Sequence, residues 1–199
     1  MAAEPQPSAV VVQLFGAALE ARPDDELMVL SRAGRREAFD VLVRRHQASA
    51  FKVASRYLGS APDAHDACQS AFLEVYRGLA RYQPRGSFVF YLRRVVLNQC
   101  RMLGRGAAIR GRAADASALQ PVAEAQLPDD ALLARERSRA LTLAVAELSE
   151  KQREVVALRY AGGHSLEDIA AILELPLGTV KSRLFSAMEK LNGHLGGSP

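Results

Sequence analysis

Residues 165–190 read SLEDIAAILELPLGTVKSRLFSAMEK, and this stretch decides the fold of the C-terminal part of the chain. Ser165 precedes apolar residues at the i, i+3, i+4 and i+7 spacing of an amphipathic helix, so we expect it to cap that helix. A turn containing Pro176 and Gly178 follows, and a last helix is predicted over 179–191. Two short helices joined by a tight turn form a helix-turn-helix.

The predicted last helix has one apolar face and one polar face. At about 100° per residue, Leu184, Met188 and Leu191 fall within about 80° of Val180, which makes that face the core side. The remaining surface is partly polar and cationic, and it carries Thr179, Lys181, Ser182, Arg183, Phe185, Ser186, Glu189 and Lys190. Such a surface fits a recognition helix in the major groove of DNA, although a surface helix of a bundle gives the same pattern.

Upstream of this motif, residues 131–165 carry a helical pattern too. Ser149 and Gln152 have the spacing of a capping box, which predicts a helix that begins there and ends at Gly162. Residues 106–130 are rich in Ala and Gly and show no hydrophobic period. We interpret them as a flexible linker with a root-mean-square span of roughly 25 Å, which makes 131–195 a separate C-terminal domain.

The first half of the chain is predicted to form another helical domain, over residues 22–105, after a loose extension at 1–21. Apolar residues at helical spacing indicate helices on either side of Gly34, the second of which stops at Gly59. Pro62 opens the next helix, and Ser87 caps a helix that runs to about Leu103. Ala, Leu, Arg and Glu are frequent and no strand pattern is evident, so the predicted fold class is all-α, with two small helical domains.

The helix predicted over 87–103 separates apolar from cationic residues. Its apolar side holds Phe88, Tyr91, Leu92, Val95 and Met102, and its other side holds Phe90, Arg94, Asn98, Arg101 and Arg105. Cations interleaved with an aromatic ring suit backbone phosphates and unstacked bases, whereas the alternative is a basic helix that faces only solvent. Because Asn98 and Arg101 lie away from the apolar side, we expect changes there to alter the free energy of unfolding by less than ~0.5 kcal/mol.

The distribution of charged residues along the chain indicates which class of partner the protein binds. The net charge is +4, but residues 22–112 carry 17 Lys and Arg against 8 Asp and Glu, which is typical of a protein with a polyanionic partner. Residues 131–199 carry 9 against 8, which predicts weak DNA binding by the isolated chain. No apolar run approaches the ~18–20 residues of a membrane span, and the apolar stretch 9–19 lacks a basic flank. We therefore expect a cytoplasmic protein without membrane insertion.

The sequence contains no pattern that is typical of an enzyme or a metal site. Cys68 and Cys100 are too few for a disulfide scaffold or a cysteine zinc site, and we expect both to be buried. His65 and Cys68 lie three apart, but two ligands make a weak metal signal, so we expect surface or capping roles for the histidines. We find no phosphate loop, no nucleophile elbow, no zinc spacing and no paired acids in a plausible pocket. We expect no catalytic residue, no metal and no cofactor.

Motifs in both halves resemble those of bacterial RNA polymerase sigma factors. In the first half, the segment 25–103 looks like sigma region 2 through Asp63-Ala64-His65-Asp66-Ala67, Gln69, Phe72-Leu73 and Gly86-Ser87-Phe88. In the second half, the segments 148–155 and 178–184 (LSEKQREV and GTVKSRL) look like sigma region 4. The short linker between them resembles that of the extracytoplasmic-function (ECF) group.

The resemblance implies a protein that binds core RNA polymerase, directs it to promoter DNA and helps to open that DNA, and that is not an enzyme. It implies contacts with the polymerase coiled coil for Asp66, Gln69, Phe72, Leu73 and Tyr76. It implies contacts with the −10 element, around a flipped-out base, for Tyr82, Arg85, Ser87, Arg94, Asn98 and Arg101. It implies contacts with the −35 element for Thr179, Lys181, Ser182, Arg183, Phe185 and Ser186. Many family members are held inactive by an anti-sigma protein, so we expect such a partner.

Four positions depart from the family pattern. His65 stands where Glu is favoured, Tyr91 where Trp is usual, Glu174 where the turn has Gly, and Ser186 where Arg is common. Because Glu174 and Ser186 lie in the helix-turn-helix, these two departures leave undetermined which −35 DNA sequence is recognised. Two other functions also stay open: a sigma-like module that sequesters a regulator, and a two-domain helix-turn-helix repressor. The first normally carries a receiver domain, and the second would not need a polymerase-binding helix.

Overall fold

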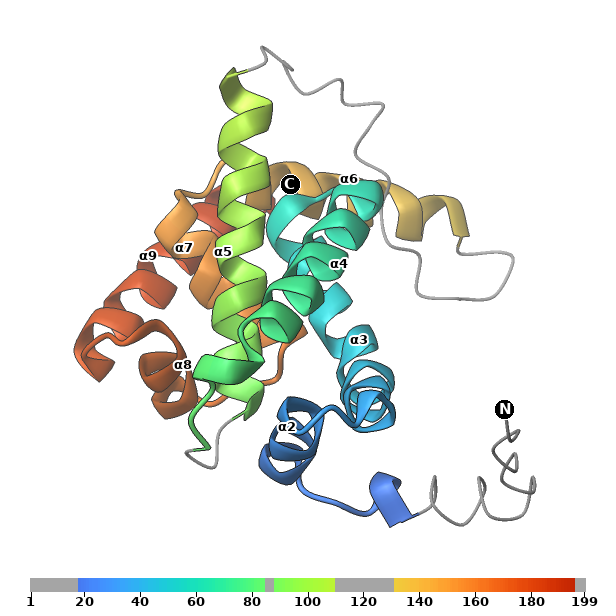
Figure 1. Ribbon diagram of the computed structural model, residues 1–199. Coiled ribbons are helices and arrows are strands. Elements are labelled where there is room, and N and C mark those ends of the chain that lie inside the picture. Colours follow the sequence, from blue (N-terminus) through green and yellow to red (C-terminus); the bar gives the residue numbers. More distant parts are fainter. Residues whose placement is uncertain (1–17, 85–87, 110–130, 196–199) are drawn as a thin grey trace, which may run out of the picture.

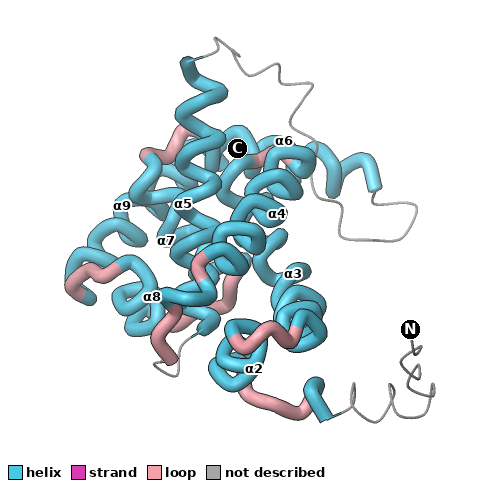
Figure 2. The backbone as a smooth tube through the Cα atoms, in the orientation of Figure 1, coloured by secondary structure: helices cyan, strands magenta, loops and turns pink. Residues whose placement is uncertain are grey.

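The computed structural model describes residues 18–84, 88–109 and 131–195, and these residues form helices and turns without any strand (Figures 1 and 2). The first domain contains α2 (Asp24–Arg32), α3 (Arg36–Leu58), α4 (Ala61–Arg77), the short 3₁₀ turn η1 (Leu79–Arg81) and α5 (Phe88–Ile109). The second contains α6 (Ala131–Ala146), α7 (Glu150–Val156), the π-helical turn η3 (Ala157–Ala161), α8 (Leu166–Leu173) and α9 (Leu177–Leu195). The all-α prediction is confirmed.

The core of the first domain lies between α3, α4 and α5. Leu42 of α3 and Leu92 of α5 have no exposed surface. The buried face of α4 is built from small side chains, namely Ala64, Ala67 and Ala71. Because these side chains are short, the neighbouring helices approach α4 closely, and added volume here would strain the packing.

The helix ends in this domain follow the local signals in the sequence. Gly59 ends α3 with φ 68°, in the left-handed conformation that glycine adopts without steric cost. Ser60 then caps α4, since its hydroxyl accepts a hydrogen bond from the backbone N–H of Asp63 at 3.4 Å. The predicted stop and start at these positions are confirmed.

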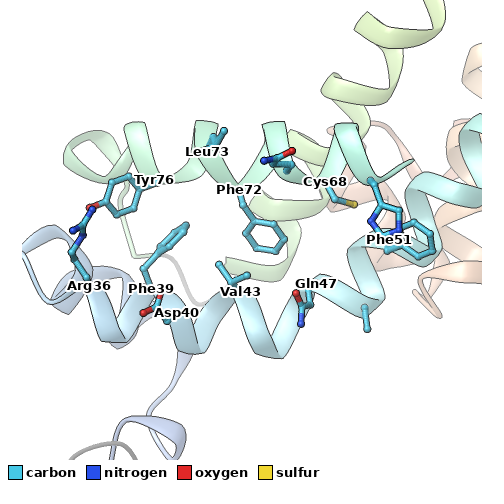
Figure 3. A pocket seen from close by; sticks show the side chains of 13 residues that line it. Arg36, Phe39, Asp40, Val43, Gln47, Phe51, Cys68, Phe72, Leu73 and Tyr76 are labelled. Carbon is cyan, nitrogen blue, oxygen red and sulfur yellow. The ribbon is translucent and has the colours of Figure 1, made fainter. Parts of the chain in front are cut away.

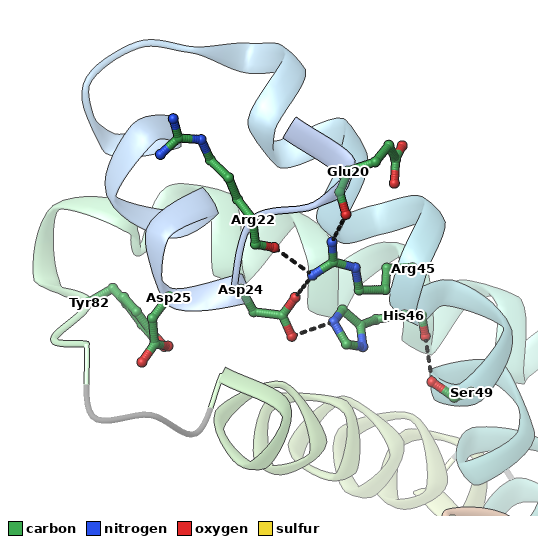
Figure 4. Close-up of polar contacts among 8 residues, drawn as sticks. All are labelled: Glu20, Arg22, Asp24, Asp25, Arg45, His46, Ser49 and Tyr82. Carbon is green, nitrogen blue, oxygen red and sulfur yellow. Dashed lines mark hydrogen bonds and ion pairs between the residues drawn. The ribbon is translucent and has the colours of Figure 1, made fainter. Parts of the chain in front are cut away.

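Polar contacts anchor the N-terminal segment to α3 (Figure 4). Arg45 donates to the carbonyl oxygen of Glu20 at 2.9 Å and pairs with the carboxylate of Asp24. The second oxygen of Asp24 lies 2.8 Å from Nε2 of His46. Leu19 is buried as well. The packed domain therefore begins before the expected boundary at residue 22, because contacts with α3 hold residues that local periodicity does not reveal.

Two serine caps organise the second domain. Ser149 accepts from the backbone N–H of Gln152, and the Gln152 side chain accepts from the backbone N–H of Ser149, so the predicted capping box is present. Ser165 forms the same reciprocal pair with Asp168 at the start of α8. These hydrogen bonds satisfy backbone N–H groups that have no partner within the first helical turn.

The two domains pack against each other, with α5 between α4 and the second domain (Figure 1). α5 contacts α8, while α3 contacts η3, α6 and α7. Leu158, Ile169 and Ile172 of the second domain belong to the same continuous apolar cluster as the core of the first domain. The sequence predicted two domains but gave no sign of this docked arrangement.

The helix α5 is longer than predicted. It continues to Ile109, past the expected end at Leu103, through Gly104 and Gly106. Glycine lowers helix stability by roughly 1 kcal/mol but does not forbid helix, and Ala107 and Ala108 favour it. Residues 106–109, which were predicted to belong to the linker, are therefore helical, while the rest of the predicted linker, 110–130, and the predicted cap Ser87 lie outside the described residues. Within the described ranges, no helix is both long and apolar enough to cross a membrane.

Candidate polymerase-binding and promoter-binding surfaces

An apolar groove of about 660 Å³ runs between α3 and α4 (Figure 3). Phe39, Val43 and Phe51 line it from α3, and Phe72 and Leu73 line it from α4. Polar side chains border it, namely Arg36, Asp40, Gln47 and Gln69. A groove with an apolar floor and polar edges is the geometry that binds an amphipathic helix.

The residues expected to bind polymerase lie on the α4 side of this groove or beside it. Asp66 and Gln69 are exposed, and Leu73 and Tyr76 retain 48% and 38% of their surface. Phe72 is buried and lines the floor, so it serves both the groove and the core. Leu73 and Tyr76 therefore add exposed apolar surface to the lining of the groove.

The α3 side of the groove was not predicted. The Phe39 ring contacts that of Tyr76 edge-on at 5.0 Å between centroids, and the Phe51 ring lies 4.3 Å from that of His65. A helical wheel treats one helix at a time and assigns both phenylalanines to a core. Their pairing with α4 depends on how two helices cross, which no local pattern encodes.

The tyrosine expected beside the −10 element is half-buried within its own domain. The hydroxyl of Tyr82 donates to the carboxylate of Asp25 in α2, and its ring lies 5.4 Å from that of Tyr91 and 6.2 Å from that of Phe88. Burial, together with the hydrogen bond to Asp25, raises the pKa of Tyr82. The neighbouring candidates Arg85 and Ser87 lie outside the described residues.

Arg94 of α5 contacts the second domain, and its side chain stays 40% exposed. Its Nε donates to the carbonyl oxygen of Ile172 at 3.0 Å, and its Nη2 donates to that of Ala171 at 3.3 Å. Its Nη1 lies 2.5 Å from Oε1 of Glu174. The carbonyls belong to the last turn of α8, where unpaired C=O groups and the helix dipole favour a cation.

Arg101, two turns further along α5, also pairs with the second domain. Its Nε contacts Oε1 of Glu154, a carboxylate whose side chain is only 6% exposed, and its Nη1 donates to Oδ1 of Asn98 at 2.6 Å. Asn98 itself is exposed. The expectation that changes at Arg101 barely affect stability is wrong for this docked arrangement, because removing the guanidinium leaves a buried carboxylate unpaired.

Arg93, next to Arg94, is buried at the contact between the domains with 3% of its surface exposed. Its Nε lies 3.4 Å from Nε2 of His164, and its Nη1 has no hydrogen-bond partner among the described residues. Burial lowers the pKa of Arg93, and burial together with the nearby guanidinium lowers that of His164. The sequence analysis did not select Arg93, although it is part of an Arg-Arg pair.

The candidate −35 residues divide into exposed and supporting side chains. Lys181, Ser182 and Phe185 are exposed on α9, and Phe185 retains 66% of its surface. Thr179 and Arg183 are half-buried. The hydroxyl of Ser186 accepts from Nε2 of Gln152 at 3.0 Å, so it holds α9 against α7.

The turn of the helix-turn-helix contains a strained residue. Glu174 has φ 54° and ψ 47°, and no other described non-glycine residue has a positive φ. A side chain in the left-handed region costs roughly 1 kcal/mol relative to glycine. The family's usual glycine would remove that strain but also the carboxylate that meets Arg94.

Both cysteines and two of the histidines, His46 and His164, occupy interior positions, whereas His65 is exposed as expected. Cys68 and Cys100 are buried free thiols, as predicted, and burial raises their pKa to about 11 and about 12. His46 and His164 are buried too, which contradicts the expected surface or capping roles. Each has a polar partner from another helix or domain, Asp24 and Arg93 respectively.

Two models of the sigma-70 family match the chain, region 2 over residues 42–108 and region 4 over residues 138–191. The chain is also 30% identical over 177 residues to the ECF RNA polymerase sigma-E factor of Escherichia coli K12, covering 85% of this chain and 92% of that protein. This chain belongs to the ECF group of RNA polymerase sigma factors. The RNA polymerase sigma-H factor of Pseudomonas aeruginosa is 29% identical over 180 residues, with the same coverage of both chains.

Solved structures of sigma factors resemble this ECF sigma factor over most of its length. The structure of CnrH in complex with the cytosolic domain of CnrY matches with a TM-score of 0.67 and 25% identity, over 88% of this chain and 99% of that chain. The sigma factor RpoE of Bartonella quintana, in complex with the anti-sigma factor NepR, matches with a TM-score of 0.61 and 21% identity, over 81% and 98%. The predicted fold, with a region 2 and a region 4 domain, is confirmed.

Proposed function

We propose that this ECF sigma factor binds core RNA polymerase, directs it to promoters with specific −35 and −10 elements, and assists in opening the DNA. The observation that carries the proposal is the separation of two exposed surfaces on two domains: the apolar groove with Leu73 and Tyr76, and the cationic α9 surface with Lys181. The first suits a protein helix and the second suits DNA. A repressor would need only the second.

The groove between α3 and α4 is the proposed site for the polymerase coiled coil. An apolar side chain from a polymerase helix would enter between Phe39 and Phe72, while Leu73 and Tyr76 would lose their exposed surface. Buried aromatic and apolar anchors dominate binding energy at protein interfaces. Asp66 and Gln69 would make polar contacts at the edge, where they confer orientation more than affinity.

Promoter contacts are assigned to both domains. Lys181, Ser182 and Phe185 would reach base edges or phosphates of the −35 element, and Thr179, Arg183 and Ser186 would support α9 at that site. Arg94, Asn98 and Arg101 on α5, with Tyr82, Arg85 and Ser87 before it, would hold the opened −10 strand. Extruding a base costs a few kcal/mol, so stacking and phosphate contacts must offset that cost.

An anti-sigma protein is a proposed partner as well. The sigma factor RpoE of Bartonella quintana is bound to the anti-sigma factor NepR in its solved structure, and CnrH is bound to the cytosolic domain of CnrY. The proposed location is the cytoplasm, where core polymerase and promoter DNA meet, and the proposed activity involves no catalysis by this chain.

Run-off transcription with core polymerase tests the function. We expect promoter-specific transcripts only when the sigma factor is present, and a modest loss of core binding for Gln69→Ala, because Gln69 lies at the polar edge of the groove. The matched control is Ser70→Ala, which alters the adjacent exposed residue of α4 outside the groove lining. The sequestering module and the repressor would both give no transcript, so a wild-type protein that binds DNA but never initiates transcription contradicts the proposal.

A further inference from the structure

Region 4 contacts the side of α5 that is proposed to hold the −10 strand, and it leaves 40% of the Arg94 side chain and 29% of the Arg101 side chain exposed. Arg94 and Arg101 each meet a carboxylate of region 4, Glu174 and Glu154, about two helical turns apart along α5. Arginine binds carboxylate and phosphate with the same planar set of N–H donors. The two glutamates therefore occupy positions that phosphates of a nucleic-acid strand would need.

We propose that Glu154 and Glu174 are internal competitors of the promoter phosphates: they hold region 4 on α5 in the free chain, and single-stranded −10 DNA binds only after Arg94 and Arg101 leave them. The inference rests on the proposed function for the identity of the strand. The competition itself requires only that α5 binds a polyanion.

The backbone at Glu174 supports this role independently of the ion pair. The residue has a left-handed conformation in which glycine is favoured, and its carboxylate contacts an arginine 80 positions earlier in the chain. A glutamate in that position gives the turn no local benefit. Its benefit lies in the contact with Arg94, which joins the two domains.

Arg93 lowers the stability of the docked arrangement, which makes separation of the domains easier. Region 4 buries its guanidinium with one nitrogen unpartnered and with a neutral imidazole nitrogen as its contact. Burying a cation without an anion disfavours the docked state. Undocking exposes Arg93 beside Arg94, so a polyanion that displaces region 4 gains a further cation.

The test measures affinity of the full-length free chain for a fluorescent single-stranded oligonucleotide by anisotropy at low and moderate salt. We compare Glu174→Gln with Glu167→Gln, which removes the same charge from an exposed position on α8. We expect Glu174→Gln to bind about three- to fivefold more tightly than the control, as the loss of one partly exposed ion pair allows. Glu174→Gly is the second variant, because it removes the carboxylate and relieves the left-handed strain, so it folds.

Energy transfer between dyes at Ser70 on α4 and Glu189 on α9 reports docking directly. We expect both Glu174 variants to lower the transfer efficiency before DNA is added, and oligonucleotide to lower it in the wild type. Equal affinity and equal transfer for the Glu174 and Glu167 variants would overturn the competition. Run-off transcription is measured in parallel. If the wild-type protein gives no promoter-specific transcript, the proposed function is refuted, whereas the competition at α5 is still decided by the anisotropy and energy-transfer results.

Discussion

Replacing Arg93 by methionine should stabilise the protein. Arg93 is 3% exposed, its Nη1 has no partner among the described residues, and its Nε donates a long hydrogen bond of 3.4 Å to His164. Leaving a buried polar group unsatisfied costs about 1–3 kcal/mol and more for a charged group, whereas the 3.4 Å hydrogen bond to His164 is longer than usual and contributes less than the ~1 kcal/mol of a typical one. Methionine retains an unbranched apolar stem, so we expect a net gain of roughly 1–2 kcal/mol and a rise in Tm of roughly 2–8 °C.

Thermal and urea denaturation followed by circular dichroism measures this change. The control is Arg105→Met, which makes the same replacement at an exposed position of α5 and should alter the free energy of unfolding by less than ~0.5 kcal/mol. If Arg93→Met lost more than about 1 kcal/mol while the control stayed unchanged, the buried guanidinium would be well solvated or paired, and the reasoning from its unpartnered nitrogen would be refuted.

Three further predictions follow from other contacts. Burial lowers the pKa of His46 and His164 in the folded protein, so on acidification the unfolded chain binds protons at a higher pH than the folded one. The free energy of unfolding, measured by urea titration, should therefore be constant above about pH 6.5 and decrease as the pH falls below that value. A free energy of unfolding that does not change with pH would contradict this. Ser149→Ala should cost about 1 kcal/mol by removing the cap of α7, measured by thermal denaturation. In transcription from promoter libraries, Lys181→Ala should alter only the −35 preference and Asn98→Ala only the −10 preference. The reverse result would show that α9 does not bind the −35 element and that α5 does not bind the −10 element.

The local elements of this fold were predictable because their signals lie within a few residues. The capping boxes at Ser149 and Ser165 each use a partner three residues later, and Gly59 ends α3 through its own backbone conformation. The apolar stripe of α9 likewise reports which side meets the core, and Val180 is fully buried as the wheel requires. Such features depend on backbone geometry that every helix shares.

The features that were missed depend on residues far apart in the sequence. The wheel of α5 separated Arg94 and Arg101 from the apolar side correctly, but it could not distinguish a solvent-facing surface from one that pairs with Glu174 and Glu154. Arg93 was missed for the same reason, since its burial is created by a second domain. Among the described residues, Glu174 was the one local sign of the docking between the domains, because it stands where the family has glycine. A glutamate with a left-handed backbone needs a contact that offsets the strain, and that contact is with Arg94.

The docked arrangement also fixes an order of events for the proposed function. The groove between α3 and α4 is open while region 4 contacts α5, and the exposed residues Leu73 and Tyr76 of α4 line that groove (Figure 3). Under the proposed function, core polymerase would bind region 2 before the domains separate, whereas the −10 strand would have to compete with Glu174 and Glu154 for Arg94 and Arg101. A free chain that is docked in this way would avoid non-specific DNA, because the polyanion must compete with carboxylates already in place. Polymerase binding that required prior undocking would instead make Glu174→Gln bind core more tightly than the wild type, and equilibrium titration of core with each protein distinguishes these two orders.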